Sequence, residues 1–131
     1  MYAMVCTRLD LAHAVSVVSK FLSNPGRMNW DAVKWIFRYL RGTTDYGITF
    51  SKQQSDPSVK GYVDADYAGD LDERRSTIGY VFTLGGGPIF WKFMTQSLIA
   101  LSTTESEYMA IAKTAKESLW LTGLVKELGI Q

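Results

Sequence analysis

The sequence of 131 residues is poor in the side chains that build covalent or metal cross-links. It contains one cysteine, Cys6, and one histidine, His13. A single cysteine cannot form an internal disulfide, and a zinc cluster of thiolates needs several cysteines or histidines. Any chemistry must therefore rest on other side chains, and the scarcity of cysteine predicts an intracellular, reducing environment.

Long apolar runs and a strong net charge are also missing. Arg8, Asp10 and His13 interrupt the N-terminal apolar segment, so no stretch approaches the roughly 18 apolar residues that a transmembrane helix needs. We therefore expect no membrane partner. The formal net charge of +1 gives no overall attraction to nucleic acid. A nucleic-acid site would have to be a local cluster of basic residues.

The first third of the sequence has the pattern of two helices. Apolar residues recur at helical spacing from Leu11 to Leu22, and Asn24-Pro25-Gly26 stops this pattern. Asn29 is then a plausible cap for a second helix, whose apolar positions run from Trp30 to Leu40. The pattern predicts a helical hairpin.

Three basic residues of the second predicted helix, Lys34, Arg38 and Arg41, follow one another at helical spacing. Such a charge run is more often a solvated helix face than a binding site. The alternative is a stripe that contacts nucleic-acid phosphates. Spacing alone does not separate these two interpretations.

The residue pattern changes near residue 46, where short segments with high β-strand propensity begin. We predict strands over residues 47–50, 60–65, 79–84, 88–92 and 98–101, which form an antiparallel meander. Gly85-Gly86-Gly87 resembles a phosphate-binding loop, but no Lys-Ser or Lys-Thr pair follows it. A hairpin turn is the better interpretation.

A long helix follows the strands. Ser102 and Glu105 have the spacing of a capping box, and Gly129 is placed to end the helix. We expect the helix to pack on the sheet through one apolar face, formed by Tyr108, Ile111, Ala112, Ala115, Leu119, Leu124 and Leu128. The predicted fold class is α/β (α+β), with a helical segment over residues 1–45 and a sheet with a packed helix over residues 46–131.

Two acidic residues are candidates for metal-dependent chemistry. Asp64 lies near the end of a predicted strand, where a carboxylate is well placed to bind a metal ion. Glu107 falls in the predicted first turn of the long helix, where the helix dipole favours a charged carboxylate. If strand and helix pack together, these two acids could meet at the edge of the sheet.

Three stretches of the sequence resemble the Pol polyproteins of copia-type retrotransposons. They are Met1–Arg8 leading to VKWIFRYLRGT at 33–43, YVDADYAGD at 62–70 followed by Arg74–Phe82, and STTESEYMA at 102–110. Together they span nearly the whole chain. The resemblance implies that residues 1–45 correspond to the reverse transcriptase thumb or connection, and residues 46–131 to the N-terminal part of a ribonuclease H domain.

The resemblance also implies a chemistry. In that family ribonuclease H hydrolyses the RNA strand of RNA–DNA hybrids with the help of divalent ions, and Asp64 and Glu107 match two of its catalytic, metal-binding acids. Mg²⁺ would be the cofactor, because it prefers oxygen ligands. An RNA–DNA hybrid and the rest of the Pol polyprotein would be the partners.

The resemblance has gaps as well. The family pattern continues into another strand that carries a third catalytic aspartate, whereas this sequence ends at Gln131; Leu9, Phe90 and Phe93 also depart from the usual residues. We therefore expect the chain to be inactive as a ribonuclease H by itself. The alternative is a noncatalytic remnant that binds nucleic acid or another protein, in the cytoplasm or the nucleus.

Overall fold

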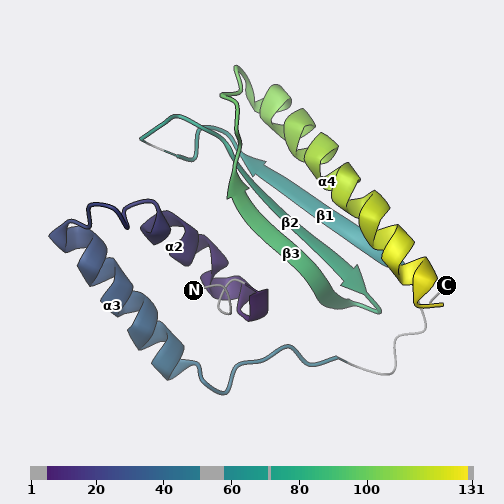
Figure 1. Ribbon diagram of the computed structural model, residues 1–131, viewed down its shortest axis with the longest axis horizontal. Helices are drawn as coiled ribbons and strands as arrows, with labels where there is room; N and C mark the ends of the chain where they lie inside the picture. Colours follow the sequence, from purple (N-terminus) through teal and green to yellow (C-terminus); the bar gives the residue numbers. More distant parts are fainter. Residues whose placement is uncertain (1–5, 51–57, 71, 130–131) are drawn as a thin grey trace. The chain divides into compact units, whose positions relative to one another are not determined.

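The computed structural model describes residues 6–50, 58–70 and 72–129. The chain divides into two compact units, Met1–Gly47 and Ile48–Gln131. We call them unit 1 and unit 2. The described part contains helices in both units and an antiparallel sheet in unit 2, which confirms a mixed α/β fold (Figure 1).

Unit 1 is a pair of helices, α2 (Leu9–Ser19) and α3 (Arg27–Gly42), which confirms the predicted helical hairpin. Three residues on one side of α2 are buried, Leu11, Ala12 and Val15. No residue of α3 is buried, and the buried residues of α2 are aliphatic. Unit 1 therefore has a small apolar core.

The predicted helix ends in unit 1 were partly wrong. Helix α2 stops at Ser19, and the chain continues in a turn before Pro25. Helix α3 begins at Arg27, three residues before the predicted start at Trp30, and its N-cap is Gly26, three residues before the expected cap, Asn29. The carbonyl oxygen of Gly26 accepts from the N–H of Trp30 at 3.2 Å, so backbone alone closes the first turn.

A polar network in unit 1 joins the start of α2 to the end of α3. The Arg8 guanidinium donates to both carboxylate oxygens of Asp10, at 2.8 and 3.0 Å, and to Thr43 Oγ1 at 2.7 Å. The Tyr39 hydroxyl donates to Asp10 at 2.9 Å. The hydrogen bonds from Arg8 lower the pKa of Asp10 to about 2 because they stabilise the charged carboxylate.

Unit 2 contains a three-stranded sheet formed by β1 (Val59–Asp66), β2 (Thr77–Leu84) and β3 (Gly87–Thr95). The strands are antiparallel in the order β1-β2-β3, as the predicted meander requires. Gly85 and Gly86 connect β2 to β3 with φ values of +56° and +79°. Both residues therefore occupy the left-handed region that a tight hairpin turn demands, which confirms the predicted turn.

Two predicted strands do not exist. Residues 46–50 have no regular structure, although the ring of Phe50 lies against Gly87. Residues 98–101 form bends between β3 and the following helix, and the N–H of Leu101 donates to the Glu105 carboxylate. Both segments are apolar enough for a strand, but neither has a neighbouring strand with which to pair.

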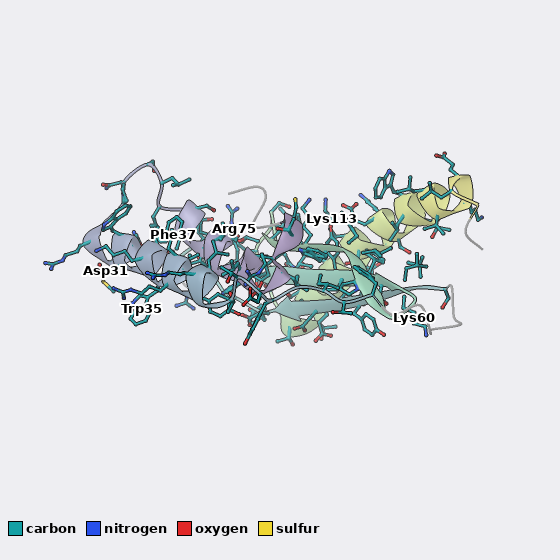
Figure 2. The ribbon with its side chains drawn as sticks, turned by 90° about the horizontal axis from the view of Figure 1, so that it is seen from below. Asp31, Trp35, Phe37, Lys60, Arg75 and Lys113 are labelled. Carbon is teal, nitrogen blue, oxygen red and sulfur yellow. The ribbon has the colours of Figure 1, made fainter. Side chains whose placement is uncertain are left out.

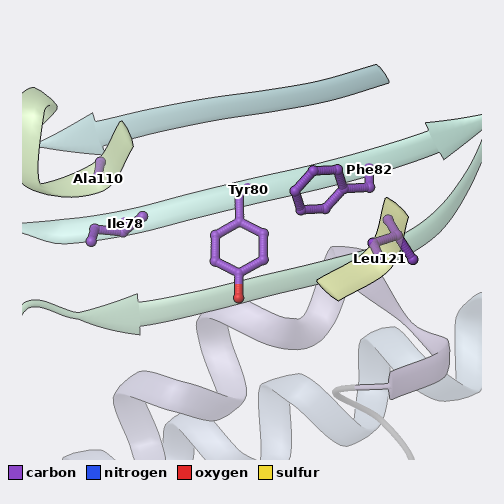
Figure 3. Packing of buried hydrophobic residues seen from close by; sticks show 5 residues of the cluster. All are labelled: Ile78, Tyr80, Phe82, Ala110 and Leu121. Carbon is purple, nitrogen blue, oxygen red and sulfur yellow. The ribbon is translucent and has the colours of Figure 1, made fainter. Parts of the chain in front are cut away.

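Helix α4 (Thr103–Glu127) covers one face of the sheet. Ile78, Tyr80 and Phe82 alternate along β2 and pack against Ala110 and Leu121 of α4, as Figure 3 shows. The rings of Tyr80 and Phe82 meet edge to face at 5.9 Å. Burial of each of these large side chains stabilises unit 2 by roughly 2 kcal/mol.

The predicted apolar face of α4 was wrong. Its buried residues are Ser106, Ala110, Thr114 and Leu121, whereas Tyr108, Ile111 and Leu119 are exposed. Small residues let the helix approach the sheet closely, and their polar groups are satisfied locally. Thr114 Oγ1, for example, donates to the Ala110 carbonyl oxygen at 2.8 Å, so its burial leaves no polar atom unpaired.

None of the described helices is both long enough and apolar enough to cross a membrane.

Candidate functional site

Asp64 lies on β1, two residues before the end of the strand, and is exposed. Thr83 of β2 donates to the carbonyl oxygen of Lys60, so Lys60 turns its backbone toward β2. In an antiparallel pair the next residues turn theirs outward. The outward N–H of Ala65 donates to Asp64 Oδ1 at 3.0 Å. The Asp64 carboxylate therefore leans over the outer edge of β1.

Glu107 is the fifth residue of α4 and is exposed. The expectation that it belongs to the first turn was wrong by one residue. The first turn is held by the predicted capping pair: Ser102 Oγ accepts from the N–H of Glu105 at 3.1 Å, and the Glu105 carboxylate accepts from the N–H of Leu101 at 2.7 Å. Glu105 therefore caps the helix, and Glu107 is the acid that remains for chemistry.

Both candidate acids lie at the same end of unit 2. Ala65, next to Asp64, packs against the cluster that contains Ala110. Helix α4 runs opposite to β1 along the sheet (Figure 1), so Glu107 lies close to the end of β1 that carries Asp64. The fold thus brings the two predicted residues to one end of the sheet, without a contact between their carboxylates that would define a site.

A buried polar brace stabilises this end of unit 2, and sequence reasoning missed it. Gln96 Nε2 donates to the carbonyl oxygen of Ser106 at 2.9 Å, next to Glu107, and the Gln96 N–H donates to the carbonyl oxygen of Ser76 at 2.8 Å. Ser76 Oγ accepts in turn from the N–H of Ala68. The brace therefore links the loop after β1 to the first turn of α4. A glutamine after a strand carries no local signal for such a role.

The acidic loop between β1 and β2 is organised by its own hydrogen bonds. Asp70 is buried; its N–H donates to the Arg75 carbonyl oxygen at 2.9 Å, and its carboxylate accepts from the N–H of Asp72 at 3.3 Å. Ala68 and Arg74 adopt positive φ values. Asp70 thus stabilises the loop, and this structural role accounts for its position.

The donor atoms near Asp64 suit a hard cation but do not complete a metal site. Carboxylate oxygens are the ligands that Mg²⁺ prefers. Within residues 6–50, 58–70 and 72–129, however, no three His, Cys, Asp or Glu side chains are grouped closely enough to hold a metal ion. Asp64 and Glu107 offer two carboxylates at most, so the described residues do not fit a complete two-metal centre.

A groove of about 280 Å³ separates β1 from the adjacent flank of α4. Val59, Gly61 and Val63 line it from the strand, and Ile111 and Ser118 line it from the helix. These odd-numbered β1 residues therefore face α4, while Lys60 and Tyr62 leave the sheet on the other face. The groove runs beside the outer edge of β1.

The predicted basic stripe on α3 is accompanied by aromatic side chains. The Lys34 ammonium lies 5.9 Å from the centre of the Trp30 ring, and the Arg38 guanidinium lies 4.9 Å from that of Trp35. Lys34 also pairs with Asp31 at 3.0 Å. Figure 2 shows Trp35 and Phe37 projecting from α3, and both are more than half exposed.

Arg41, the third residue of the stripe, lies in the last turn of α3. A cation there interacts favourably with the helix dipole. Stabilisation of the helix end is therefore a structural reason for this residue, and the two cation–tryptophan pairs join side chains three or four positions apart, which are neighbours on the surface of α3.

Comparison with known proteins identifies close relatives over nearly the whole chain. It is 58% identical to a retrovirus-related Pol polyprotein from transposon TNT 1-94 of Nicotiana tabacum, over 99% of this chain and 10% of that protein. It is 44% identical to a retrovirus-related Pol polyprotein from transposon RE2 of Arabidopsis thaliana, over 95% of this chain and 8% of that protein. The chain thus spans a tenth or less of these polyproteins.

A third relative has a different name. The chain is 49% identical to the secreted RxLR effector protein 161 of Plasmopara viticola, over 93% of this chain and 85% of that protein. No family model and no solved structure matches the chain. The extent and identity of these matches show that the chain is homologous to a segment of retrovirus-related Pol polyproteins from transposons.

Proposed function

We propose that unit 2 derives from a metal-dependent ribonuclease H, which hydrolyses the RNA strand of RNA–DNA hybrids, and that Asp64 and Glu107 are its metal ligands. The observation that carries this proposal is that the two acids lie at the same end of unit 2, Asp64 on the outer edge of β1 and Glu107 in the second turn of α4. The resemblance of YVDADYAGD and STTESEYMA to the retrotransposon ribonuclease H supports the same assignment.

The proposed cofactor is Mg²⁺, which would supply an activated water and stabilise the leaving oxygen. The chain's own contribution is to hold two carboxylates in place. The Asp64 carboxylate accepts a hydrogen bond from the Ala65 N–H, and the brace from Gln96 holds the backbone at Ser106, next to Glu107. Because the described residues assemble no third ligand, we propose that the 131-residue chain alone binds Mg²⁺ weakly and does not cleave the hybrid.

Mn²⁺ titration followed by NMR tests the shared metal site. The paramagnetic ion should broaden the amide signals around Asp64 and Glu107 together, at the same ion concentration. Asp64→Asn or Glu107→Gln should reduce the broadening at both positions. Asp72→Asn, in the exposed loop, is the matched control and should leave it unchanged. Broadening that is confined to one of the two acids would disprove a common site.

A labelled RNA–DNA hybrid tests the activity with Mg²⁺ or Mn²⁺. We expect no cleavage above background by folded protein. Cleavage that both Asp64→Asn and Glu107→Gln abolish would instead show that the chain is an active ribonuclease H and that other residues complete the site.

A second candidate function is noncatalytic binding of nucleic acid by the Lys34, Arg38 and Arg41 stripe. The specific observation is the pairing of Lys34 and Arg38 with exposed tryptophans, because bases stack on aromatic rings while cations contact phosphates. A role outside a full polyprotein is also consistent with the relative that carries the name of an effector and of which this chain covers 85%.

Tryptophan fluorescence tests this second function. Oligonucleotides should quench the emission, and the affinity should fall as the salt concentration rises, since phosphate contacts release counterions. Arg38→Gln with Arg41→Gln should weaken binding severalfold. The control is Lys113→Gln with Lys116→Gln on α4, which removes the same charge from an exposed helix. Equal losses in both double variants would indicate nonspecific attraction and contradict a site on α3.

A further inference from the structure

We infer that the side of α3 turned away from α2 binds a single strand of nucleic acid in preference to a duplex, with a row of cations on the phosphates and two tryptophans stacked on the bases. The inference rests on the second candidate function, nucleic-acid binding by α3, and adds the kind of nucleic acid, a fourth cation and a role for the tryptophans. It is carried by the order of side chains around α3, by their charge and by the exposure of two rings.

The side chains of α3 are sorted around the helix. Because successive residues of an α-helix are turned by about 100°, four exposed cations fall within a sector of about 60° on one side: Arg27, Lys34, Arg38 and Arg41. The half-buried residues of α3 lie on the opposite side: Asn29, Ala32, Val33, Ile36 and Leu40. Helix α3 contacts α2. The largely apolar side therefore meets α2, and the cationic row faces away from it.

The cations of this row have few anionic neighbours. Lys34 pairs with Asp31 at 3.0 Å, whereas no carboxylate in the described part of the chain forms an ion pair with Arg27, Arg38 or Arg41. A surface that covers such cations must supply anions, because an unpaired buried charge is costly. A nucleic-acid backbone offers anions in a closely spaced series. The row extends about 21 Å along the helix axis, at about 1.5 Å per residue, so it spans several phosphates.

A tryptophan flanks the row on each side. Trp30 and Trp35 are about 140° apart around α3, and the sector between them contains the four cations. The two tryptophans are 59% and 65% exposed, and Figure 2 shows Trp35 projecting from the helix. The charged groups of Lys34 and Arg38 lie over the two rings and hold them beside the row. Both rings keep surface that is open for stacking.

The tryptophans favour a single strand over a duplex. A surface of cations alone binds a duplex at least as well, because the duplex has the higher density of charge. The bases of a duplex are stacked on one another, whereas those of a single strand are free to stack on aromatic side chains. A strand that follows the cationic row has Trp30 on one side and Trp35 on the other. Its bases therefore meet a ring on either side.

Fluorescence anisotropy with labelled DNA tests this preference. The probes are a single strand of about 12 nucleotides without internal complementarity, and the duplex that it forms with its complement. We expect the 131-residue chain to bind the single strand about tenfold more tightly, because only the single strand gains stacking. Equal affinity, or a preference for the duplex, would overturn this inference and leave the second candidate function standing. Failure to bind either probe would disprove both.

Substitution of a tryptophan separates stacking from charge. Trp35→Leu should weaken binding of the single strand about tenfold and leave binding of the duplex within about twofold, since it removes a ring but no charge. Trp35→Phe keeps a ring and should retain most of the affinity. The matched control is Trp120→Leu on α4, where the tryptophan is 57% exposed, and it should change neither affinity. Equal losses in Trp35→Leu and Trp120→Leu would overturn the inference.

The fourth cation has a test of its own. Arg27 is the first residue of α3, where a cation opposes the helix dipole, so helix stability gives no reason for it. Arg27→Gln should reduce the slope of the logarithm of affinity against the logarithm of salt concentration by about 0.7, the value for one phosphate contact of a single strand. Lys113→Gln removes the same charge from α4 and should leave the slope unchanged. An unchanged slope in Arg27→Gln would overturn the row of four cations.

Discussion

Unit 1 and unit 2 use apolar residues in opposite ways. Unit 2 encloses Tyr80 and Phe82, which are each 2% exposed, between its sheet and α4. Unit 1 carries more aromatic residues in α3 than unit 2 buries, yet α3 has no buried residue, and Trp30, Trp35 and Phe37 are exposed. A sheet with a helix on it creates an interior, whereas two helices by themselves cover little surface.

This difference predicts that unit 2 supplies most of the stability, and that unit 1 depends on polar contacts such as the Arg8–Asp10–Tyr39 network. Apolar burial scales with the area removed from water. The exposed aromatic face of α3 is instead available for ligands or partners. The following substitutions test the contrast.

The largest effect should come from the core of unit 2. Phe82→Ala removes a buried ring and leaves a cavity, which should lower the free energy of unfolding by about 3–5 kcal/mol in urea titrations followed by circular dichroism. Phe37→Ala, the matched substitution on α3, should change it by less than about 0.5 kcal/mol. Comparable losses would mean that α3 is covered in solution and that the contrast between the units is wrong.

Tyr80 should make unit 2 sensitive to alkaline pH. Burial of the hydroxyl, and to a smaller extent the negative charge of Glu117, raise the pKa of Tyr80 from the ordinary value of 10.0 to about 12. A raised pKa means that the folded state holds the proton more tightly, so this stability is complete below pH 10 and is lost as the pH rises toward 12. The loss should be roughly 2 kcal/mol.

Phenylalanine has no ionisable group, so Tyr80→Phe should abolish this loss of unfolding free energy. Urea titrations between pH 9 and 12 will measure it. Tyr62→Phe, which changes an exposed tyrosine of β1, should retain it. An unchanged pH dependence in Tyr80→Phe would show that another group controls alkaline unfolding.

The helix cap should have an intermediate effect. Ser102→Ala removes the acceptor for the Glu105 N–H at the start of α4 and should cost about 1 kcal/mol of unfolding free energy. Ser102→Asp keeps an acceptor there and should be nearly neutral. A loss of the same size in both variants would mean that the hydroxyl group, and not capping, is what α4 requires.

The smallest effect should appear in unit 1 at acid pH. The pKa of Asp10 is lowered to about 2 from 3.8 by its hydrogen bonds with Arg8, so the stability it gives is present above about pH 4 and is lost as the pH falls toward 2. Because the Asp10 side chain is 37% exposed, water screens the pair and its contribution stays below about 1 kcal/mol.

NMR can follow this loss through the α2 and α3 amide signals between pH 5 and 2. Asp10→Asn should flatten their pH dependence, while the signals of unit 2 should behave as in the unchanged chain. Acid sensitivity that persists in Asp10→Asn would assign the effect to a different carboxylate.

The sequence predicted the two acidic residues of the candidate site but not the hydrogen bonds that hold the backbone around them. Asp64 at a strand end and Glu107 near a helix start follow from local pattern. Gln96 forms hydrogen bonds with Ser76, 20 positions earlier in the chain, and with Ser106, 10 positions later. Local sequence patterns do not predict contacts between residues so far apart. The metal-binding role of the two acids stays a prediction.

The sequence by itself determined the local features of this protein. The turn at Gly85 and Gly86 and the cap at Ser102 each depend on residues at most three positions apart in the chain. Backbone sterics and local hydrogen bonds suffice to specify them.

Only the tertiary structure decided which segments become strands and which face of α4 is buried. Residues 47–50 and 98–101 have suitable composition but no neighbouring strand, and a strand exists only through its pairing. On α4 the small residues Ala110 and Thr114 pack on the sheet in place of the apolar Ile111 and Leu119. Close approach of backbones and the satisfaction of buried polar groups outweighed the hydrophobic pattern, because both depend on what the helix packs against.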